Sequence, residues 1–130
     1  GLVGRVDAVV SEASRVQLIT DKISAVNIML KNSKTEAILT GSITGDLSLG
    51  MISHDVTIES NDVVLTSGLG GDYPPNILVG QIISVSNQDY DLFQTASVQP
   101  IVDFSRIEFI LVITNFNPVD IAPLVPTVNP

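Results

Sequence analysis

Short apolar segments recur along the chain at intervals of roughly ten residues, and turn-forming residues separate them. No window of eleven or more residues shows a convincing helical period of apolar positions. The pattern predicts strands at residues 3–10, 15–20, 25–30, 36–40, 47–52, 63–66, 79–86, 93–98 and 107–113. Such spacing is typical of β-sandwiches and barrels. We therefore predict an all-β chain of small, mostly antiparallel β-barrels, with about nine short strands and no substantial helix.

The most apolar of these segments is residues 107–113, which is the length of a strand. Ile107, Phe109 and Leu111 alternate with Glu108 and Ile110, so both faces are largely apolar. No stretch of the chain approaches the roughly 20 apolar residues that a membrane helix needs. The sequence begins at Gly1 without a signal peptide. We expect it to be part of a longer protein, with any membrane anchor outside this chain.

A segment rich in glycine and proline joins the strands predicted at 63–66 and 79–86. It contains Gly68, Gly70, Gly71, Pro74 and Pro75. Glycine supplies positive φ without steric cost, whereas proline fixes φ and removes a hydrogen-bond donor. A phosphate-binding glycine loop needs a helix directly after it, and the paired prolines prevent one. The segment is therefore interpreted as a stiff link between strands.

Two strands resemble each other around a glycine. The run Leu2-Val3-Gly4-Arg5-Val6 matches Leu78-Val79-Gly80-Gln81-Ile82. A glycine at the same point of both strands indicates a bend or bulge at a barrel corner. We predict a first barrel subdomain at 1–60, incomplete and able to recruit later strands, a second at 61–114, and a proline-rich flexible tail at 115–130.

Composition narrows the possible functions. Hydrophobic residues make up 45% of the chain but aromatic residues only 5%, so Val, Ile and Leu must build the core. The net charge is −8, and Arg106 is the only Lys or Arg after residue 50. Such a surface repels phosphate groups, which argues against binding of nucleic acid or anionic lipid. The chain has no cysteine, which excludes disulfides and thiolate chemistry.

Candidate catalytic and metal-binding residues are few. His54, Asp62 and Ser67 contain the groups of a serine hydrolase triad, but Ser67 lacks the sequence context of a nucleophile. A hydrolase-like β-barrel using Ser67 and His54 stays open as the alternative. Asp89 and Asp91 could offer oxygens to Ca²⁺, yet no distal Glu is spaced to complete a site. We expect no catalytic residue, metal or cofactor, and favour an interaction module with exposed apolar surface or strand edges.

The chain resembles the rod shape-determining protein MreC family over about residues 1–113. The resemblance is strongest at residues 64–71 and 73–75, and it extends to residues 1–6, 14–21, 37–41, Val98, Pro100 and 107–113. Two positions depart from the family pattern, since Asn61 and Asn76 stand where glycine is usual. Asparagine is the non-glycine residue best suited to positive φ, so both changes are compatible with the same backbone.

The resemblance implies a bacterial protein with a membrane helix, a coiled coil and a β-region of two small barrels outside the membrane. Family members are non-enzymatic scaffolds of the cell-wall elongation machinery that controls cell shape. They self-associate and bind a penicillin-binding transpeptidase and the membrane protein MreD. The resemblance thus places the chain on the periplasmic or cell-wall side. The structural motif would comprise Gly4, Thr66, Ser67, Gly68, Gly70, Gly71, Pro74, Pro75 and Gly80.

Overall fold

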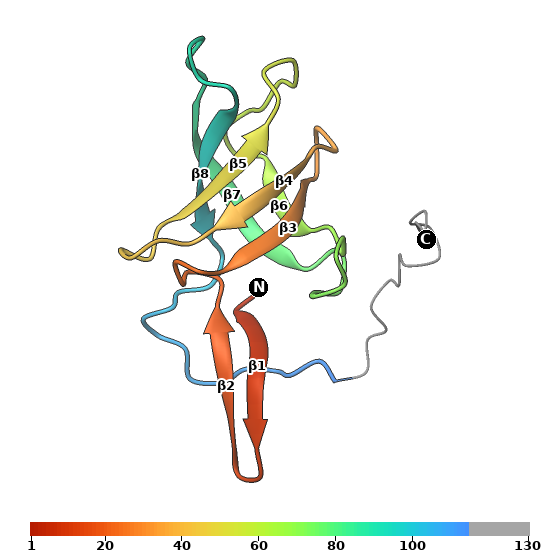
Figure 1. The fold of residues 1–130 in the computed structure, drawn as a ribbon, viewed down its shortest axis with the longest axis vertical. Helices are drawn as coiled ribbons and strands as arrows, with labels where there is room; N and C mark the ends of the chain where they lie inside the picture. Colours follow the sequence, from red (N-terminus) through yellow and green to blue (C-terminus); the bar gives the residue numbers. More distant parts are fainter. Residues whose placement is uncertain (115–130) are drawn as a thin grey trace, which may run out of the picture.

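The computed structural model describes residues 1–114, which form eight β-strands and no helix (Figure 1). Eight of the strands predicted from the sequence are thereby confirmed. Their bounds are β1 Gly4–Val10, β2 Ala13–Leu18, β3 Ala25–Leu30, β4 Glu36–Thr40, β5 Leu47–Ile52, β6 Val63–Thr66, β7 Leu78–Ser86 and β8 Gln94–Pro100.

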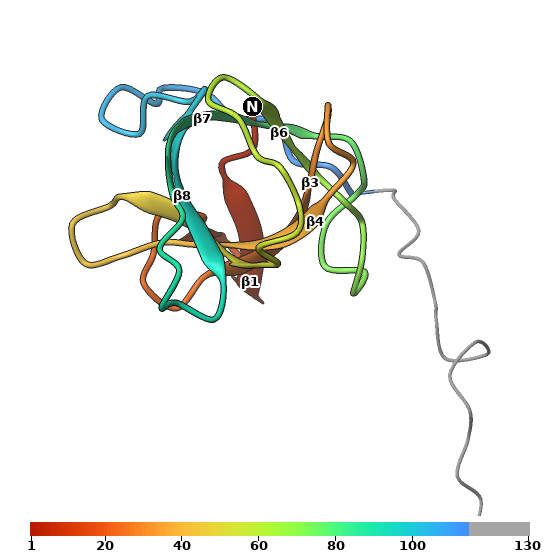
Figure 2. The ribbon, with the colours of Figure 1, turned by 90° about the horizontal axis from the view of Figure 1, so that it is seen from above.

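Six of the strands close into one antiparallel barrel in the order β3-β4-β5-β8-β7-β6. Figure 2 looks into this barrel, with the strands arranged around its interior. Alternate residues of each strand point inward, and aliphatic side chains fill the space as the composition predicts. The most deeply buried of them are Ile28, Leu30, Leu39, Leu49, Ile52, Val26, Val64, Val79 and Ile82.

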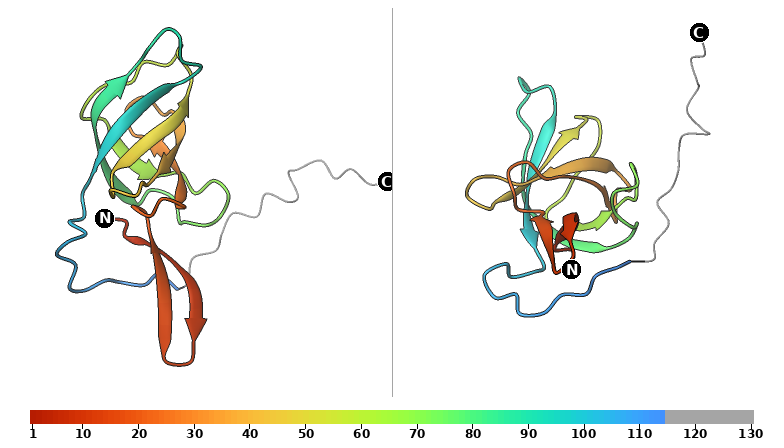
Figure 3. Two further views of the ribbon diagram at one scale, coloured as in Figure 1. Left: turned by 60° about the vertical axis from the view of Figure 1, so that its left-hand side comes forward. Right: turned by 60° about the horizontal axis from the view of Figure 1, so that its bottom comes forward.

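Strands β1 and β2 form a separate two-stranded sheet that projects from one end of the barrel (Figures 1 and 3). Strands of the predicted first subdomain, at residues 25–52, close the barrel together with β6, β7 and β8. The boundary predicted at residue 60 therefore runs through this barrel, and of the eight strands only those of the hairpin lie outside it. A first barrel built around β1 and β2 stays a prediction.

The β1–β2 and β7–β8 hairpins have the same register. Gly4 opens the first ladder and Gly80 opens the second, and each is followed by two further residue pairs. A β-bulge then interrupts the first strand, after Val6 in β1 and after Ile82 in β7. A bulge thus occurs in both strands, but it follows Val6 and Ile82 and does not lie at the glycines, and β1 is not part of the barrel.

The two glycines also share a tight backbone environment. A Cβ atom at Gly4 would lie 2.0 Å from the carbonyl oxygen of Gln17, and a Cβ at Gly80 would lie 2.0 Å from that of Gln99. No larger residue fits without movement of the partner strand, because the obstructing atom belongs to the backbone. The sequence similarity between the two strands therefore reflects the same steric requirement at both places.

The strand predicted at residues 107–113 is wrong. These residues have no regular secondary structure, and Phe109 and Leu111 are 92% and 97% exposed. Alternating apolar residues are compatible with a strand, but a strand also needs an open edge to pair with. The closed barrel offers no such edge, and residues 107–113 do not pair with the open edges of the β1–β2 hairpin. The proline-rich tail predicted at 115–130 lies outside the described residues.

Candidate functional site

The glycine–proline connector between β6 and β7 has a strongly shaped backbone. Gly68, Gly70 and Gly71 have φ values of 78°, 81° and 77°, and Asn76 has a φ of 65°. Asn61, before β6, has a φ of 72°. The expectation that asparagine replaces glycine at positive φ is therefore confirmed at both positions. The connector turns in a way that ordinary L-residues adopt only with strain.

Thr66, at the end of β6, holds the two halves of the connector together. Its hydroxyl donates a hydrogen bond to the Pro74 carbonyl at 2.6 Å and accepts one from the Ile77 backbone N–H at 2.8 Å. Its backbone carbonyl accepts a third bond from the N–H of Asn76 at 2.8 Å. The side chain is fully buried. These bonds fix Pro74 and Pro75 beside the strand that they follow.

Hydrogen bonds also attach the tip of the connector to β3. Asn27 donates its side-chain amide to the Leu69 carbonyl at 3.1 Å, and its own carbonyl accepts the Ser67 N–H at 3.0 Å. The Ser67 hydroxyl accepts the Leu69 N–H at 3.1 Å, which satisfies the turn locally. Ser67 is therefore engaged in backbone geometry.

We expect Gly70→Val to lower the free energy of unfolding by about 1–2 kcal/mol, because a β-branched residue is strained at positive φ. A Cβ at Gly70 would also lie 3.2 Å from the Asn27 side-chain amide nitrogen. Urea denaturation followed by circular dichroism measures the loss. Gly50→Val is the matched control, since Gly50 is not at positive φ and has no atom within 4 Å of its Cβ position. A Gly70→Val variant as stable as the parent would contradict the prediction.

The connector also secures the hairpin to the barrel. Tyr73 packs into the hydrophobic core, and this burial raises the pKa of its phenol. The neighbouring Asp72 forms an exposed salt bridge with Arg5 of β1, with the nitrogen and oxygen 3.4 Å apart. Leu2 and Ile19, at the base of the hairpin, are buried in the same core. The hairpin therefore leaves the barrel from a packed junction.

The groups of the alternative hydrolase do not meet. His54 lies in the connection before β6 and Ser67 follows β6, so the length of this strand separates them (Figure 1). The ring nitrogens of His54 instead contact the Asn87 side-chain oxygen at 2.6 Å and the Asp91 carbonyl oxygen. The hydrogen bond to the Asp91 carbonyl and, to a smaller extent, the bond to Asn87 raise the pKa of His54. A triad of His54 with Ser67 is excluded by this arrangement.

The described part of the chain contains no candidate metal site. Within residues 1–114, no three His, Asp or Glu side chains gather as they would around a metal ion. Asp89 and Asp91 therefore belong to no such group, and Ca²⁺ needs more oxygen ligands than two carboxylates supply. Residues 1–114 likewise contain no helix long and apolar enough to cross a membrane.

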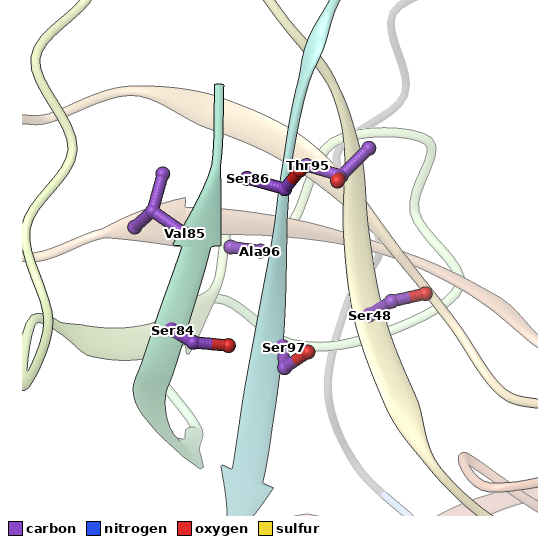
Figure 4. A pocket seen from close by; sticks show the side chains of 7 residues that line it. All are labelled: Ser48, Ser84, Val85, Ser86, Thr95, Ala96 and Ser97. Atoms are coloured by element: carbon purple, nitrogen blue, oxygen red, sulfur yellow. The ribbon is translucent and has the colours of Figure 1, made fainter. Parts of the chain in front are cut away.

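A shallow hollow of about 120 Å³ lies on the outer wall of the barrel, over β5, β8 and β7 (Figure 4). Hydroxyl groups dominate its lining, from Ser48, Ser84, Ser86, Thr95 and Ser97. The residues that line it carry no charge, and they belong to neighbouring strands of a flat sheet surface. It is smaller and more open than the concave sites that enclose small molecules.

Exposed apolar side chains also lie away from the barrel wall, on the β1–β2 hairpin and in residues 107–113. On the hairpin, Val6, Val9 and Val10 are 39%, 72% and 68% exposed. All six large apolar side chains in residues 107–113 are also exposed. Val6 and Val9 occupy the register positions that Ile82 and Val85 hold in the β7–β8 hairpin, where both side chains face the barrel core. This hairpin face has the residue types of a protein interior without a cover.

The sequence anticipated the glycines and prolines of this region but not the side chains that hold them. The predicted structural motif includes Thr66 because of its place in the sequence. The pair of hydrogen bonds that its side chain makes could not be inferred from the sequence. Asn27 is absent from the predicted motif, and Tyr73 enters it only as part of residues 73–75, because both side chains act on segments far away along the chain. The alternation of residues 25–30 could have indicated that Asn27 lies outside the core, but not what it contacts.

The family model described as "Rod shape-determining protein MreC, barrel core" matches residues 1–114. A curated relative from Cereibacter sphaeroides, the cell shape-determining protein MreC, is 33% identical over 113 residues, which cover 87% of this chain and 36% of the relative. The chain spans about a third of the length of the curated relatives it matches.

Solved structures show the same architecture. MreC from Pseudomonas aeruginosa superposes with a TM-score of 0.71 at 26% identity, over 77% of this chain and 65% of that chain. A chain of the complex between Penicillin-Binding Protein (PBP2) and MreC from Helicobacter pylori superposes with a TM-score of 0.57. The two chains are 24% identical over 63% of this chain and 51% of that chain. This comparison shows a likeness of fold alone.

Proposed function

This chain belongs to the rod shape-determining protein MreC family, and we propose that it acts as a non-enzymatic scaffold of the bacterial cell-wall elongation machinery. Its role would be to bind other proteins through sheet surfaces and strand edges. The observation that carries the proposal is the apolar face of the β1–β2 hairpin, which nothing within residues 1–114 covers. A stable barrel holds this face away from its own core, where a partner can reach it (Figure 3).

The partners proposed are a second copy of the protein, a penicillin-binding transpeptidase and an MreD-like membrane protein. The solved complex of PBP2 with MreC from Helicobacter pylori supports the transpeptidase as a partner of this chain. Residues 51–114 carry eight acidic side chains and a single Lys or Arg, which is Arg106. We therefore do not propose nucleic acid as a partner. We place the chain outside the cytoplasmic membrane, anchored there through a segment outside this sequence.

The register of the hairpin supports the predicted organisation into two barrel subdomains. In the β7–β8 hairpin, the outer edges of both strands pair with β6 and β5. The β1–β2 hairpin has the same register and the same bulge, but its outer edges are unpaired within residues 1–114. We propose that it belongs to a first barrel, in which further strands pair with these outer edges.

The scaffold proposal predicts that Val9→Asp weakens self-association or transpeptidase binding by about tenfold or more, because it places a charge in the centre of an apolar interface. Sedimentation velocity measures self-association, and biolayer interferometry measures binding to a purified transpeptidase. Ile43→Asp is the matched control, since Ile43 is 87% exposed in the turn between β4 and β5.

Equal losses for Val9→Asp and Ile43→Asp would show that the hairpin face is not the contact surface. A protein that stays monomeric at high concentration and binds no transpeptidase would remove the scaffold proposal itself. Circular dichroism of both variants verifies that the barrel is intact, so that loss of binding is separated from loss of folding.

A further inference from the structure

Two loops meet at the end of the barrel opposite the hairpin: the β5–β6 connection, residues 53–62, and the β7–β8 loop, residues 87–93 (Figure 1). Their base is joined by Gln94, whose side chain is 1% exposed. Its amide nitrogen donates to the carbonyl oxygens of Ser53 and Val56, each at 2.6 Å. This buried amide does not titrate, so the base of the loop pair stays connected at every ordinary pH.

Above this base, His54 connects the same two loops with a group that does titrate. Its Nδ1 lies 2.6 Å from the Asn87 Oδ1, and its Nε2 contacts the Asp91 carbonyl oxygen. A carbonyl oxygen can only accept, so Nε2 must carry a proton to make this bond. The protonated imidazole donates to both partners at once. The neutral ring keeps only one N–H, and Asn87 must then turn its amide to donate to Nδ1.

The charged groups around the imidazole favour its protonated form. The carboxylates of Asp89 and Asp91, on the β7–β8 loop, both raise the pKa of His54. Asp55, on the same connection as His54, accepts a hydrogen bond from the Ser53 hydroxyl. Because the folded-state pKa is raised, the stabilisation is fully present below the ordinary histidine value. It is lost as the pH rises through the folded-state value.

We propose that His54 is a pH-responsive clip, which is closed when the imidazole is protonated and holds the β7–β8 loop against the β5–β6 connection. The loop presents Tyr90 and Leu92, which are 84% and 82% exposed. Closing the clip restricts the arrangements that these two side chains adopt. Opening it releases the tip of the loop while Gln94 keeps the base in place. This device acts independently of the hairpin face.

Amide hydrogen exchange measured by NMR tests the clip on the whole chain. After correction for the intrinsic pH dependence, we expect amides of residues 88–92 to exchange about two- to fivefold more slowly at pH 5.5 than at pH 8, a size typical of one exposed charge-assisted contact. His54→Gln should remove this difference. The Lys34 amide, which bonds the Leu30 carbonyl in the β3–β4 turn, is the internal control and should not change.

Titration of the His54 ring resonances separates a clip from a merely structural histidine. Asn87→Asp replaces the amide beside His54 with a carboxylate, which can only accept hydrogen bonds when it is ionised. This change should move the His54 titration to higher pH. Asn87→Ala should move it to lower pH, and Asp89→Asn should do so to a smaller extent. Two results would overturn the proposal. One is a His54 that titrates as in an unstructured peptide. The other is a His54→Gln protein whose loop amides keep the same pH-dependent protection from exchange as the parent.

Discussion

Gly80→Val is expected to lower the free energy of unfolding by about 3 kcal/mol or more, because it forces a side chain into the backbone of the partner strand. A Cβ at this position would lie 2.0 Å from the Gln99 carbonyl oxygen and 2.9 Å from the Pro100 Cα. Neither atom belongs to a side chain that could rotate away. The β7–β8 ladder must therefore separate locally, and this ladder is one of the six that close the barrel.

Urea denaturation followed by circular dichroism measures this loss of unfolding free energy. Two further variants, Gly50→Ala and Gly4→Val, show where the loss comes from. Gly50→Ala is the matched control within β5, because no atom lies within 4 Å of the Cβ position of Gly50. It should change stability by less than about 0.5 kcal/mol, the usual range for an unobstructed surface substitution. A Gly80→Val protein as stable as Gly50→Ala would show that the close strand approach is not required.

Gly4→Val meets the same 2.0 Å obstruction, from the Gln17 carbonyl oxygen, but in a hairpin outside the barrel. We expect the barrel transition to be affected less than in Gly80→Val, whereas the hairpin amides lose their protection from exchange. The comparison separates the cost to the hairpin from the cost to the barrel, since the local geometry of the two glycines is the same.

Thr66→Val is expected to lower the free energy of unfolding by about 2–4 kcal/mol, because it keeps the shape of the side chain but removes its hydroxyl. The Ile77 N–H and the Pro74 carbonyl then lose a partner in a half-buried setting. Bonds of this kind are costly to leave unmade, since folding has already removed the groups from water.

Thr66→Ser is the matched control, because it retains the hydroxyl and loses one buried methyl group. We expect it to cost about 1 kcal/mol, as for other small deletions of buried carbon. Both free energies come from the same denaturation experiment. If Thr66→Val and Thr66→Ser prove equally stable, then the hydroxyl does not hold the connector. The positive φ values of its glycines would then be its main determinant.

The sequence predicted the local elements of this protein with fair accuracy. Alternating aliphatic residues identified eight strands, and the asparagines at 61 and 76 indicated positive φ. The repeated glycine indicated bulges in β1 and β7, although these follow Val6 and Ile82 and do not lie at the glycines. Each of these features depends on residues close together along the chain, whose conformational preferences act locally. Family membership followed from the same local motifs.

The failures concern contacts between distant residues. Residues 107–113 have a strand-like pattern but no strand, because the barrel closes without them and they pair with neither open edge of the β1–β2 hairpin. His54 was considered with Ser67, whereas its partners Asn87 and Asp91 lie more than thirty residues away in the chain. Nothing in the spacing of these residues indicates that the two loops meet at one end of the barrel.

The sequence by itself determined the strand class, the stiff connector and the absence of cysteine chemistry, since side-chain shape and backbone preference act over a few residues. Only the tertiary structure decided which strands close the barrel, which apolar face stays uncovered and which loops His54 joins. Those outcomes depend on which strand edges pair after the chain has closed on itself. A sequence pattern with a period of two specifies a face of each strand, but it does not specify the neighbour.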